Sequence, residues 1–467
     1  MAEYYDDLLK LCGFEDEEIN RERPRIEKVF QRLEIGPADM ERAESWTRQN
    51  HDVELAGVRK ILRLWLKELI DLVLAREEGR KLVYYGFPTI AGPAGTIAAA
   101  SDEVFCTCPD VVLCHTLGQI FNKLNPILEA GEENGLPPGH GLCSLQQVRV
   151  GGMAKGIIPV PDLALTSSYF CDMGSKTDEL LHERYGHPAV YVDGSMDSRW
   201  GEFPEYLPER VEFLGGQLEK VFEGVKEVLG VEVTEADRSE GASRSRDLMG
   251  ALRELVELMS GADPQPVSID DVEMARRLTV GSASKRILVE GPQAIALLSQ
   301  GVKERIDKGI GVVEKGAPRI MIYLAHFSDP GIVRMIESCG LSIPQTYLAA
   351  TTSKYRRGTP FIAGEILAKE EMARGSFHSN YGVVTRAAEI IQEANVDGVI
   401  WNYLYNCRPI SLPAYLLKRF VEKETGIPVL ALEFDLADSR TYSAGALRTR
   451  VETFAEMLRA RKASVRV

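Results

Sequence analysis

The chain lacks the features that define several large classes of protein. None of its apolar runs approaches the ~20 residues that a membrane-spanning helix needs. It also lacks a basic stripe, and its formal net charge of −14 opposes binding to nucleic-acid phosphates. The acidic start, Met1–Asp7, does not show the basic-then-apolar order of a signal peptide. We therefore expect a cytoplasmic protein that binds neither nucleic acid nor membrane.

The sequence also lacks closely paired cysteines and a phosphate-binding loop. A structural zinc site usually contains local pairs such as Cys-x2-Cys, and none occurs here. The chain contains no Gly-x4-Gly-Lys-[Ser/Thr] loop, so we expect no bound nucleotide. In a reducing cytoplasm we expect no disulfide framework. The eight cysteines are scattered along the chain: Cys12, Cys106, Cys108, Cys114, Cys143, Cys171, Cys339 and Cys407.

The remaining pattern predicts an α/β fold with two similar parallel-sheet domains of the flavodoxin or Rossmann type, preceded by a helical segment. Val53–Arg76 carries apolar residues at helical spacing. Short apolar runs then alternate with helix-length segments, as in parallel sheets. The predicted strands are Lys81–Gly86, Val104–Cys114, Leu163–Phe170, Ala189–Val192, Arg319–Ala325, Thr346–Ala350, Gly398–Tyr403 and Val429–Phe434. The predicted units are residues 1–80 (helical), 81–235 (first α/β domain), 236–310 (helical connection, with a loop at Thr234–Ser243) and 311–467 (second α/β domain).

Two distant segments resemble each other and support the idea of two similar domains. Asp162–Asp193 and Asp397–Asp435 each contain an Asp before a buried strand, a cysteine just past the strand, a helix, and a Gly-x-Pro entry to the next strand. Ligands of parallel sheets bind outside the carboxyl ends of the strands. Cys171 and Cys407 both fall at such ends, and we expect them to face a cleft between the domains.

Cys143 adds a third thiol, at the start of the helix that precedes the Cys171 strand. A helix N-terminus favours the thiolate, which is the form that binds iron. Three converging thiolates suit an iron–sulfur cubane better than zinc. A [4Fe–4S] cluster normally has four cysteine ligands, so three would leave one iron open.

The other five cysteines are predicted to be ordinary buried or surface residues. Cys12 lies in the helical N-terminal segment and Cys339 ends a helix. Cys106 and Cys108 would point to the same face of a strand, and with Cys114 they form an alternative soft-metal site.

Four segments resemble the benzoyl-CoA reductase and 2-hydroxyacyl-CoA dehydratase superfamily, in the manner of its D-component subunits. The resemblance extends from about residue 80 to the end. The segments are Leu142–Arg149 (LCSLQQVR), Thr166–Lys176 (TSSYFCDMGSK), Trp401–Pro409 (WNYLYNCRP) and Ile427–Arg440 with the residues up to Glu456. The first departs from the family pattern, because Leu145 follows Cys143-Ser where the family has an aromatic residue.

The resemblance implies that Cys143, Cys171 and Cys407 bind a [4Fe–4S] cluster in an anaerobic enzyme. It also implies a CoA thioester substrate, a separate ATP-hydrolysing iron–sulfur activator, and a partner that is either a homologous subunit or a second copy. Three hypotheses remain open. They are a class I benzoyl-CoA reductase subunit, favoured by the Trp-Asn-Tyr run and the long helical N-terminus; a 2-hydroxyacyl-CoA dehydratase subunit; and a double-cubane reductase or electron-transfer subunit without its own substrate site.

Accessory groups are predicted from their position near the expected cleft. His326 and Asp329, at the end of a predicted strand, are the catalytic candidates. Near the cysteines, four residues are candidates for binding substrate or for hydrogen bonds to the cluster environment: Ser168, Asp172, Asn402 and Arg408. His187 precedes Pro188 at a strand start and is predicted to be structural.

Overall fold

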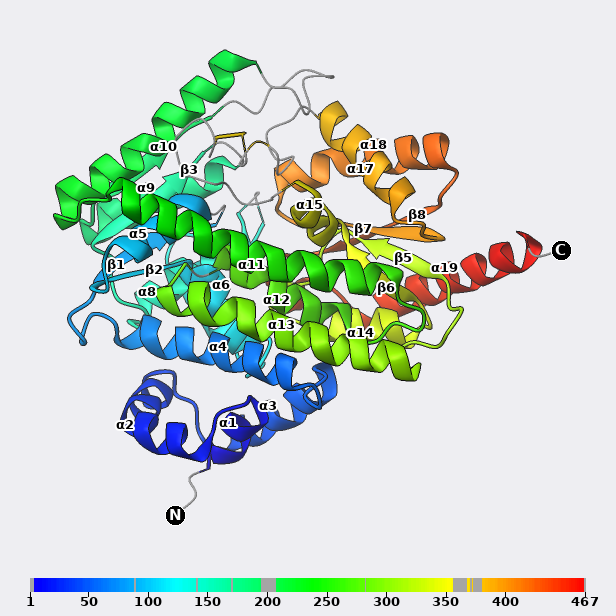
Figure 1. The fold of residues 1–467 in the computed structure, drawn as a ribbon, viewed down its shortest axis with the longest axis horizontal. Helices are drawn as coiled ribbons and strands as arrows, with labels where there is room; N and C mark the ends of the chain where they lie inside the picture. Colours follow the sequence, from blue (N-terminus) through cyan, green and yellow to red (C-terminus); the bar gives the residue numbers. More distant parts are fainter. Residues whose placement is uncertain are drawn as a thin grey trace.

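The fold consists of two parallel four-stranded sheets that lie side by side, with helices around them (Figure 1). The computed structural model describes residues 4–87, 90–139, 142–168, 171–194, 207–281, 283–355, 368–369, 372 and 380–465. The first sheet has the order β2-β1-β3-β4, and the second has the order β6-β5-β7-β8. The predicted α/β class with two similar parallel sheets and an N-terminal helical segment is confirmed.

The strands of the two sheets follow the same topology. The first sheet contains β1 (Lys81–Tyr85), β2 (Val104–Thr107), β3 (Leu163–Ser167) and β4 (Ala189–Val192). The second contains β5 (Arg319–Ile322), β6 (Ser342–Thr346), β7 (Gly398–Leu404) and β8 (Val429–Phe434). In both sheets the third strand in spatial order is also the third in sequence, so β3 and β7 are equivalent. A feature at the end of β3 therefore has a counterpart at the end of β7.

Helices connect the strands and enclose the sheets. We call the first sheet with its helices (residues 81–229) the first half, and the second sheet with its helices (residues 319–465) the second half. The helices of the first half are α5 (Ala91–Ala100), α6 (Pro109–Leu113), the π-helix η1 (Cys114–Gly118), α7 (Asn125–Glu133), α8 (Ser144–Ala154), α9 (Asp172–Tyr185) and α10 (Pro208–Leu229). Those of the second half are α14 (Gly331–Ser338), α15 (Tyr347–Tyr355), α17 (Asn380–Glu393), α18 (Arg408–Thr425), the 3-10 turn η2 (Ser439–Thr441) and α19 (Ala444–Val465). Within the described ranges no helix is both long and apolar enough to cross a membrane.

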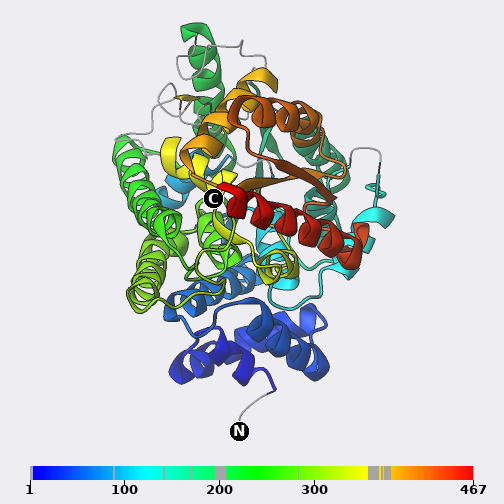
Figure 2. The same ribbon diagram turned by 90° about the vertical axis from the view of Figure 1, so that its right-hand side faces the viewer.

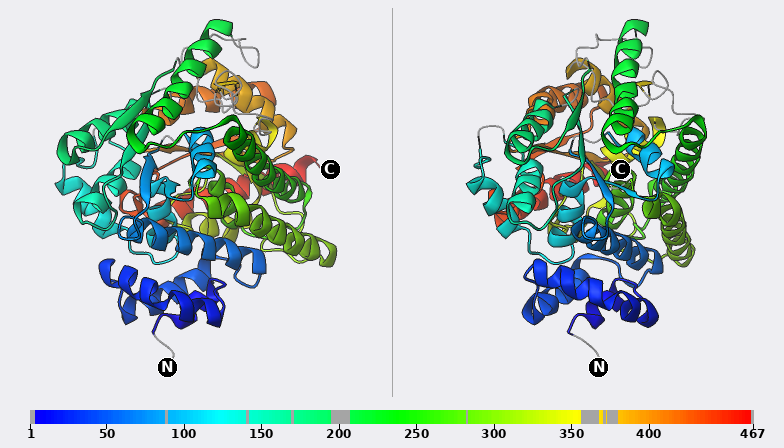
Figure 3. Two further views of the ribbon diagram at one scale, coloured as in Figure 1. Left: turned by 60° about the vertical axis from the view of Figure 1, so that its left-hand side comes forward. Right: turned by 90° about the vertical axis from the view of Figure 1, so that its left-hand side faces the viewer.

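A layer of long helices extends along both sheets. It contains α4 (Ala56–Leu74), α11 (Glu235–Gly261), α12 (Ile269–Gly281) and α13 (Lys285–Lys308). The N-terminal helices α1 (Asp6–Leu11), α2 (Asp16–Arg32) and α3 (Pro37–Asn50) lie beyond α4, at the end of the molecule opposite α10 and α18 (Figures 1 and 2). Figure 3 shows the same arrangement from the other side.

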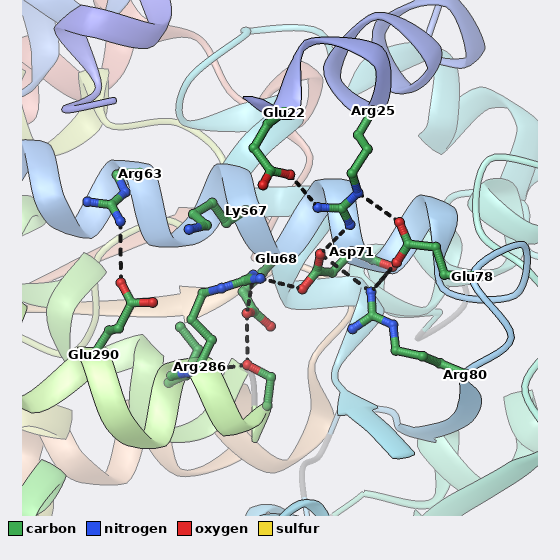
Figure 4. A network of polar contacts seen from close by, with 12 residues as sticks. Glu22, Arg25, Arg63, Lys67, Glu68, Asp71, Glu78, Arg80, Arg286 and Glu290 are labelled. Carbon is green, nitrogen blue, oxygen red and sulfur yellow. Dashed lines mark hydrogen bonds and ion pairs between the residues drawn. The ribbon is translucent and has the colours of Figure 1, made fainter. Parts of the chain in front are cut away.

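Partly buried ion pairs connect α2 to this layer (Figure 4). Arg25 of α2 pairs with Asp71 of α4 at 2.7 Å, and Arg286 of α13 pairs with the same carboxylate at 2.7 Å. Arg286 also lies 3.3 Å from Glu68. The attraction between these opposite charges offsets part of the cost of removing them from water. The shared Asp71 carboxylate thus fixes how α2, α4 and α13 meet.

Three sequence-based boundaries are wrong, each for a local reason. The run Val104–Cys114 is not one strand, because Pro109 begins α6 directly after β2. Tyr347–Ala350 belongs to α15, and the strand before it is Ser342–Thr346. Thr234–Ser243 is not a loop, because Thr234 and Asp237 form a capping box that starts α11 there.

Candidate metal centre

Cys143, Cys171 and Cys407 occupy the same local position, the residue that caps a helix N-terminus. Cys143 precedes α8, Cys171 precedes α9 and Cys407 precedes α18, each with an extended backbone. All three residues are partly exposed. The free N–H groups and the dipole of a helix N-terminus place positive potential at such a thiol. At each position this potential acts in favour of the thiolate that a metal would bind, but at Cys143 burial outweighs it and raises the pKa of the thiol.

The three thiols belong to one electrostatic neighbourhood. Cys171 and Cys407 follow the equivalent strands β3 and β7, so they stand at the carboxyl ends of the two sheets. Burial raises the pKa of the Cys143 thiol well above its ordinary value, and Cys407 and Cys171 both raise it further. Like charges shift each other's pKa in this way only when they are close. Cys143 therefore lies within electrostatic range of both Cys171 and Cys407.

Cysteine thiolates are the usual ligands of iron–sulfur clusters and are also ligands of zinc. Among the described residues no group of three His, Cys, Asp or Glu side chains is arranged to hold one metal ion. Burial is the main cause of the raised pKa of Cys143, and repulsion from Cys407, Asp435 and Cys171 raises it further. A cationic iron core would offset that repulsion.

Asp435, just past β8, is a further charged group at this site that the sequence did not single out. Its carboxylate accepts hydrogen bonds from the amides of Ala437 and Asp438, both at 3.0 Å. Ser144, the residue after Cys143, also hydrogen-bonds to it. Asp435 raises the pKa of Cys143 and is itself 1% exposed. The sequence did contain a signal for this residue, because Asp435 ends the second of the two similar segments as Asp193 ends the first.

The predicted polar neighbours of the cysteines have distinct environments. Ser168 donates to Asp193 at 2.7 Å, and Asp172 is exposed at the start of α9. Asn402 is 1% exposed and accepts from the amide of Leu324 at 3.3 Å, while its Nδ2 has no hydrogen-bond partner within the described ranges. Arg408 begins α18, and its side chain lies outside the described part of the chain. Asn402 is therefore the buried member of this set with a spare donor.

His326 and Asp329 lie near each other, in a loop past β5. The His326 ring is fully buried, and its Nδ1 accepts from the amides of Ser328 at 3.1 Å and Asp329 at 2.9 Å. Burial, together with Arg277, lowers the pKa of His326 to about 3. The ring is therefore neutral at pH 7, with its proton on Nε2. Asp329 accepts from the Tyr442 hydroxyl and from the Gly331 amide.

Three aromatic rings pack together beside Cys407. The rings of Tyr323 and Tyr347 stack at 5.6 Å, and Trp401 lies 4.4 Å from Tyr323. Burial raises the pKa of Tyr323, and the Cys407 thiol raises it further, so the phenol lies within electrostatic range of that thiol. These rings form a buried aromatic wall, in which Tyr323 and Tyr347 directly follow β5 and β6 and Trp401 lies within β7.

The remaining cysteines have no such exposed position. Cys106, Cys108 and Cys114 are fully buried, and burial raises the pKa of each thiol. Cys106 lies on β2, Cys108 caps α6 and Cys114 begins η1, so the three do not share a strand face. Cys12 and Cys339 follow the C-terminal ends of α1 and α14.

Comparison with known proteins places these features in a family. Residues 106–458 match the family described as 2-hydroxyglutaryl-CoA dehydratase, D-component. The chain is 24% identical to the alpha subunit of (R)-2-hydroxyglutaryl-CoA dehydratase from Acidaminococcus fermentans, over 65% of this chain and 61% of that protein. It is 20% identical to the (R)-phenyllactyl-CoA dehydratase alpha subunit of Clostridium sporogenes, over 69% of this chain and 77% of that protein.

A reductase component is similar to the same degree. A subunit of the benzoyl-CoA reductase from Thauera aromatica is 23% identical over 68% of this chain and 78% of that protein. The resemblance found in the sequence is therefore confirmed at the level of the superfamily, whose members include subunits of dehydratases and of a reductase. The family match includes the segments that carry Cys143, Cys171 and Cys407, and the chain belongs to the 2-hydroxyglutaryl-CoA dehydratase D-component family.

Proposed function

We propose that the chain is the [4Fe–4S]-carrying catalytic subunit of an ATP-activated, low-potential enzyme that acts on an acyl-CoA thioester. Cys143, Cys171 and Cys407 are the proposed cluster ligands. The observation that carries the proposal is that all three cysteines cap a helix N-terminus and that Cys171 and Cys407 follow two equivalent strands. Cys143 lies within electrostatic range of both. A cluster held by three thiolates would supply low-potential electrons and one iron open to a substrate oxygen.

The protein's own residues have complementary tasks in this proposal. The three helix N-termini stabilise the thiolates. Asp435 adds negative charge near Cys143, which disfavours an added electron and so lowers the reduction potential of a cluster bound there. Asn402 offers a buried donor, and the aromatic wall of Tyr323, Tyr347 and Trp401 excludes water beside Cys407.

Single substitutions test the ligand assignment. Cys143→Ala, Cys171→Ala and Cys407→Ala should each lower the iron and acid-labile sulfide of anaerobically purified protein and weaken its visible absorption. Cys12→Ala is the matched control, because Cys12 is a buried cysteine in the N-terminal helices, and it should leave the iron content unchanged. The assignment is wrong if all three variants keep a full cluster.

The first candidate reaction is the reduction of an aromatic acyl-CoA of the benzoyl-CoA type. The aromatic wall beside Cys407 favours it, since aromatic side chains pack well against an arene. The second candidate is dehydration of a 2-hydroxyacyl-CoA, favoured by the family match and by the dehydratase relatives.

Electron stoichiometry separates the two reactions. The chain would be incubated with its activator, ATP, a reductant and either benzoyl-CoA or a 2-hydroxyacyl-CoA. A reductase consumes two electrons and two protons for each ring that it reduces to a diene. A dehydratase forms the enoyl-CoA and water without net consumption of reductant. Turnover of only the 2-hydroxyacyl-CoA would reject the first candidate.

The partners follow from the same proposal. The chain would receive electrons from a separate ATP-hydrolysing iron–sulfur activator and would pair with a homologous subunit or with a second copy. The subunit names of the relatives support a multi-subunit assembly. The third hypothesis remains as an alternative. Counting iron separates a single cubane from a double cubane, and lack of turnover with either substrate would favour a subunit that only transfers electrons.

A further inference from the structure

Arg149 is a buried charged residue outside the set of proposed cluster ligands. It lies on α8, six residues after Cys143, and is only 1% exposed. Its Nη1 lies 3.4 Å from Asp178, and its Nε lies 3.7 Å from Asp110. Both carboxylates are almost fully buried. These three residues, which we call the Arg149 trio, form an ion-pair group inside the first half of the molecule.

The trio joins two of the helices that carry the proposed ligands. Asp178 is on α9, seven residues or about two helical turns after Cys171. Arg149 is on α8, whose N-terminus is capped by Cys143. The Arg149–Asp178 pair therefore connects the Cys143 helix to the Cys171 helix directly. Thr166 of β3 also hydrogen-bonds to Asp178, which ties the pair to the strand that leads to Cys171.

Gly86, just past β1, leaves space for the Arg149 guanidinium. A Cβ on Gly86 would lie 1.2 Å from Nη1 of Arg149. Gly86 has no positive φ angle, so its backbone conformation does not require glycine. The absence of a side chain at this position instead fits the close approach of the guanidinium.

The trio also reaches the boundary between the two halves. Asp110 accepts from the amide of Phe87 at 3.0 Å, and the carbonyl of Phe87 accepts from Gln146 of α8. The Phe87 ring packs against Phe327 of the second half, with ring centroids 5.9 Å apart. Ser144 of α8 accepts from the Ala437 amide at 3.0 Å, on the same boundary. The start of α8 is thus hydrogen-bonded both to Phe87 of the first half and to Ala437 of the second.

Stability alone is a weak explanation for such a group. Burying an ion pair costs desolvation energy that its attraction barely offsets, and apolar replacements are often as stable. The guanidinium lies within ion-pair distance of both carboxylates, although its Nε and Nη1 make no hydrogen bond among the described residues, and its Nη2 donates to Gln146. Contacts on three sides give the planar group a fixed position. Burial alone would lower the pKa of the Arg149 guanidinium, but Asp110 and Asp178, followed by Cys108 and Cys143, together raise it.

We propose that Arg149 is a positioning residue that fixes the Cys143 and Cys171 helix N-termini relative to each other for cluster binding. The inference rests on the proposed function and adds a residue outside the ligand set. Arg149 acts through α8 and α9 and does not itself bind iron.

The test measures how fast iron is lost to a chelator from the anaerobically purified full chain, together with the electron paramagnetic resonance spectrum of the reduced protein. Arg149→Met removes the charge and the fork, and Arg149→Lys keeps only the charge. Gly86→Ala keeps every charged group and occupies the space of the guanidinium. Arg286→Met is the matched control, because it removes a largely buried arginine of α13 that pairs with two carboxylates of α4, neither of which is a helix capped by a proposed ligand (Figure 4).

We expect Arg149→Met and Gly86→Ala to lose iron about ten- to hundredfold faster than wild type, the range typical of residues that orient metal ligands. Arg149→Lys should fall in between. Arg149→Met and Gly86→Ala should also change the electron paramagnetic resonance spectrum of the reduced cluster. Arg286→Met should melt at a lower temperature yet keep the wild-type rate of iron loss and the wild-type spectrum.

The opposite pattern overturns the inference. If Arg149→Met and Gly86→Ala lose iron no faster than Arg286→Met, the trio has only a structural role. If Arg149→Met does not fold, the Gly86→Ala result decides. Wild-type protein without iron would instead reject the proposed function, so the two failures are distinguishable.

Discussion

At the scale of single residues, cysteine position carries more information than cysteine number. Cys143, Cys171 and Cys407 combine partial exposure with a helix N-cap. Cys108 also caps a helix but is fully buried, and its thiol is desolvated. The sequence predicted the start of the Cys143 helix and the strand ends before the other two. Their convergence depends on how the two halves pack, which local patterns do not specify.

The buried His326 ring should make the protein less stable in acid. Its folded pKa of about 3 lies below the ordinary value near 6.5, so the unfolded chain binds the extra proton between these pH values. The stability due to the neutral ring is therefore complete above pH 6.5 and falls as the pH falls toward 3. Between pH 7 and pH 5 the loss should be about 2 kcal/mol.

His326→Asn isolates this effect, because an amide oxygen can accept the same backbone hydrogen bonds without titrating. Denaturant unfolding at pH 7 and pH 5 should show a smaller loss for the variant than for wild type. If wild type and variant lost the same free energy of unfolding between pH 7 and pH 5, His326 would be protonated in the folded protein near pH 6. The other histidines and carboxylates titrate in both proteins and cancel in the comparison.

At the scale of elements, close helix packing depends on particular glycines. Gly57 lies where α4 crosses α13, and a Cβ there would lie 2.3 Å from the backbone of Leu298. Gly250 lies inside α11, and a Cβ there would meet nothing within 4 Å. The same Gly→Ala change should therefore have opposite effects at the two sites.

Gly57→Ala should destabilise the protein by about 1–3 kcal/mol or more, because backbone atoms of α13 must move. Gly250→Ala should stabilise it by up to about 1 kcal/mol, since alanine favours the helix. Thermal unfolding of both variants beside wild type measures the difference. Similar melting temperatures for the two variants would contradict the close crossing of α4 and α13.

Element boundaries also show what sequence patterns miss. Ala189–Val192 and Val429–Phe434 were predicted with the correct bounds, because each run is apolar and follows a Gly-x-Pro turn. The polar run Thr234–Ser243 was predicted as a loop, although its capping box starts α11. Polarity was a poor guide there, because the first turns of α11 are largely exposed and a helix at the surface needs few apolar residues.

At the scale of the whole molecule, the repeated strand–cysteine pattern predicted two similar parallel sheets, and the sheets have the same strand order. The contacts between the halves could not be predicted in this way. Ser144 meets the Ala437 amide, Gly118 allows close approach of Ser328, and Arg277 donates to the carbonyl of Ala325. Such contacts join residues about 50 to 300 positions apart and have no local periodicity.

The central claim is that three cysteines from the two halves hold one cluster with an open iron. Mössbauer spectroscopy of 57Fe-enriched, anaerobically purified protein tests it most directly, because it reports the ligand environment of each iron. The account predicts four irons per chain, three alike and one distinct, with the distinct iron responding to an added acyl-CoA. Four equivalent irons, or a chain without iron, would contradict it.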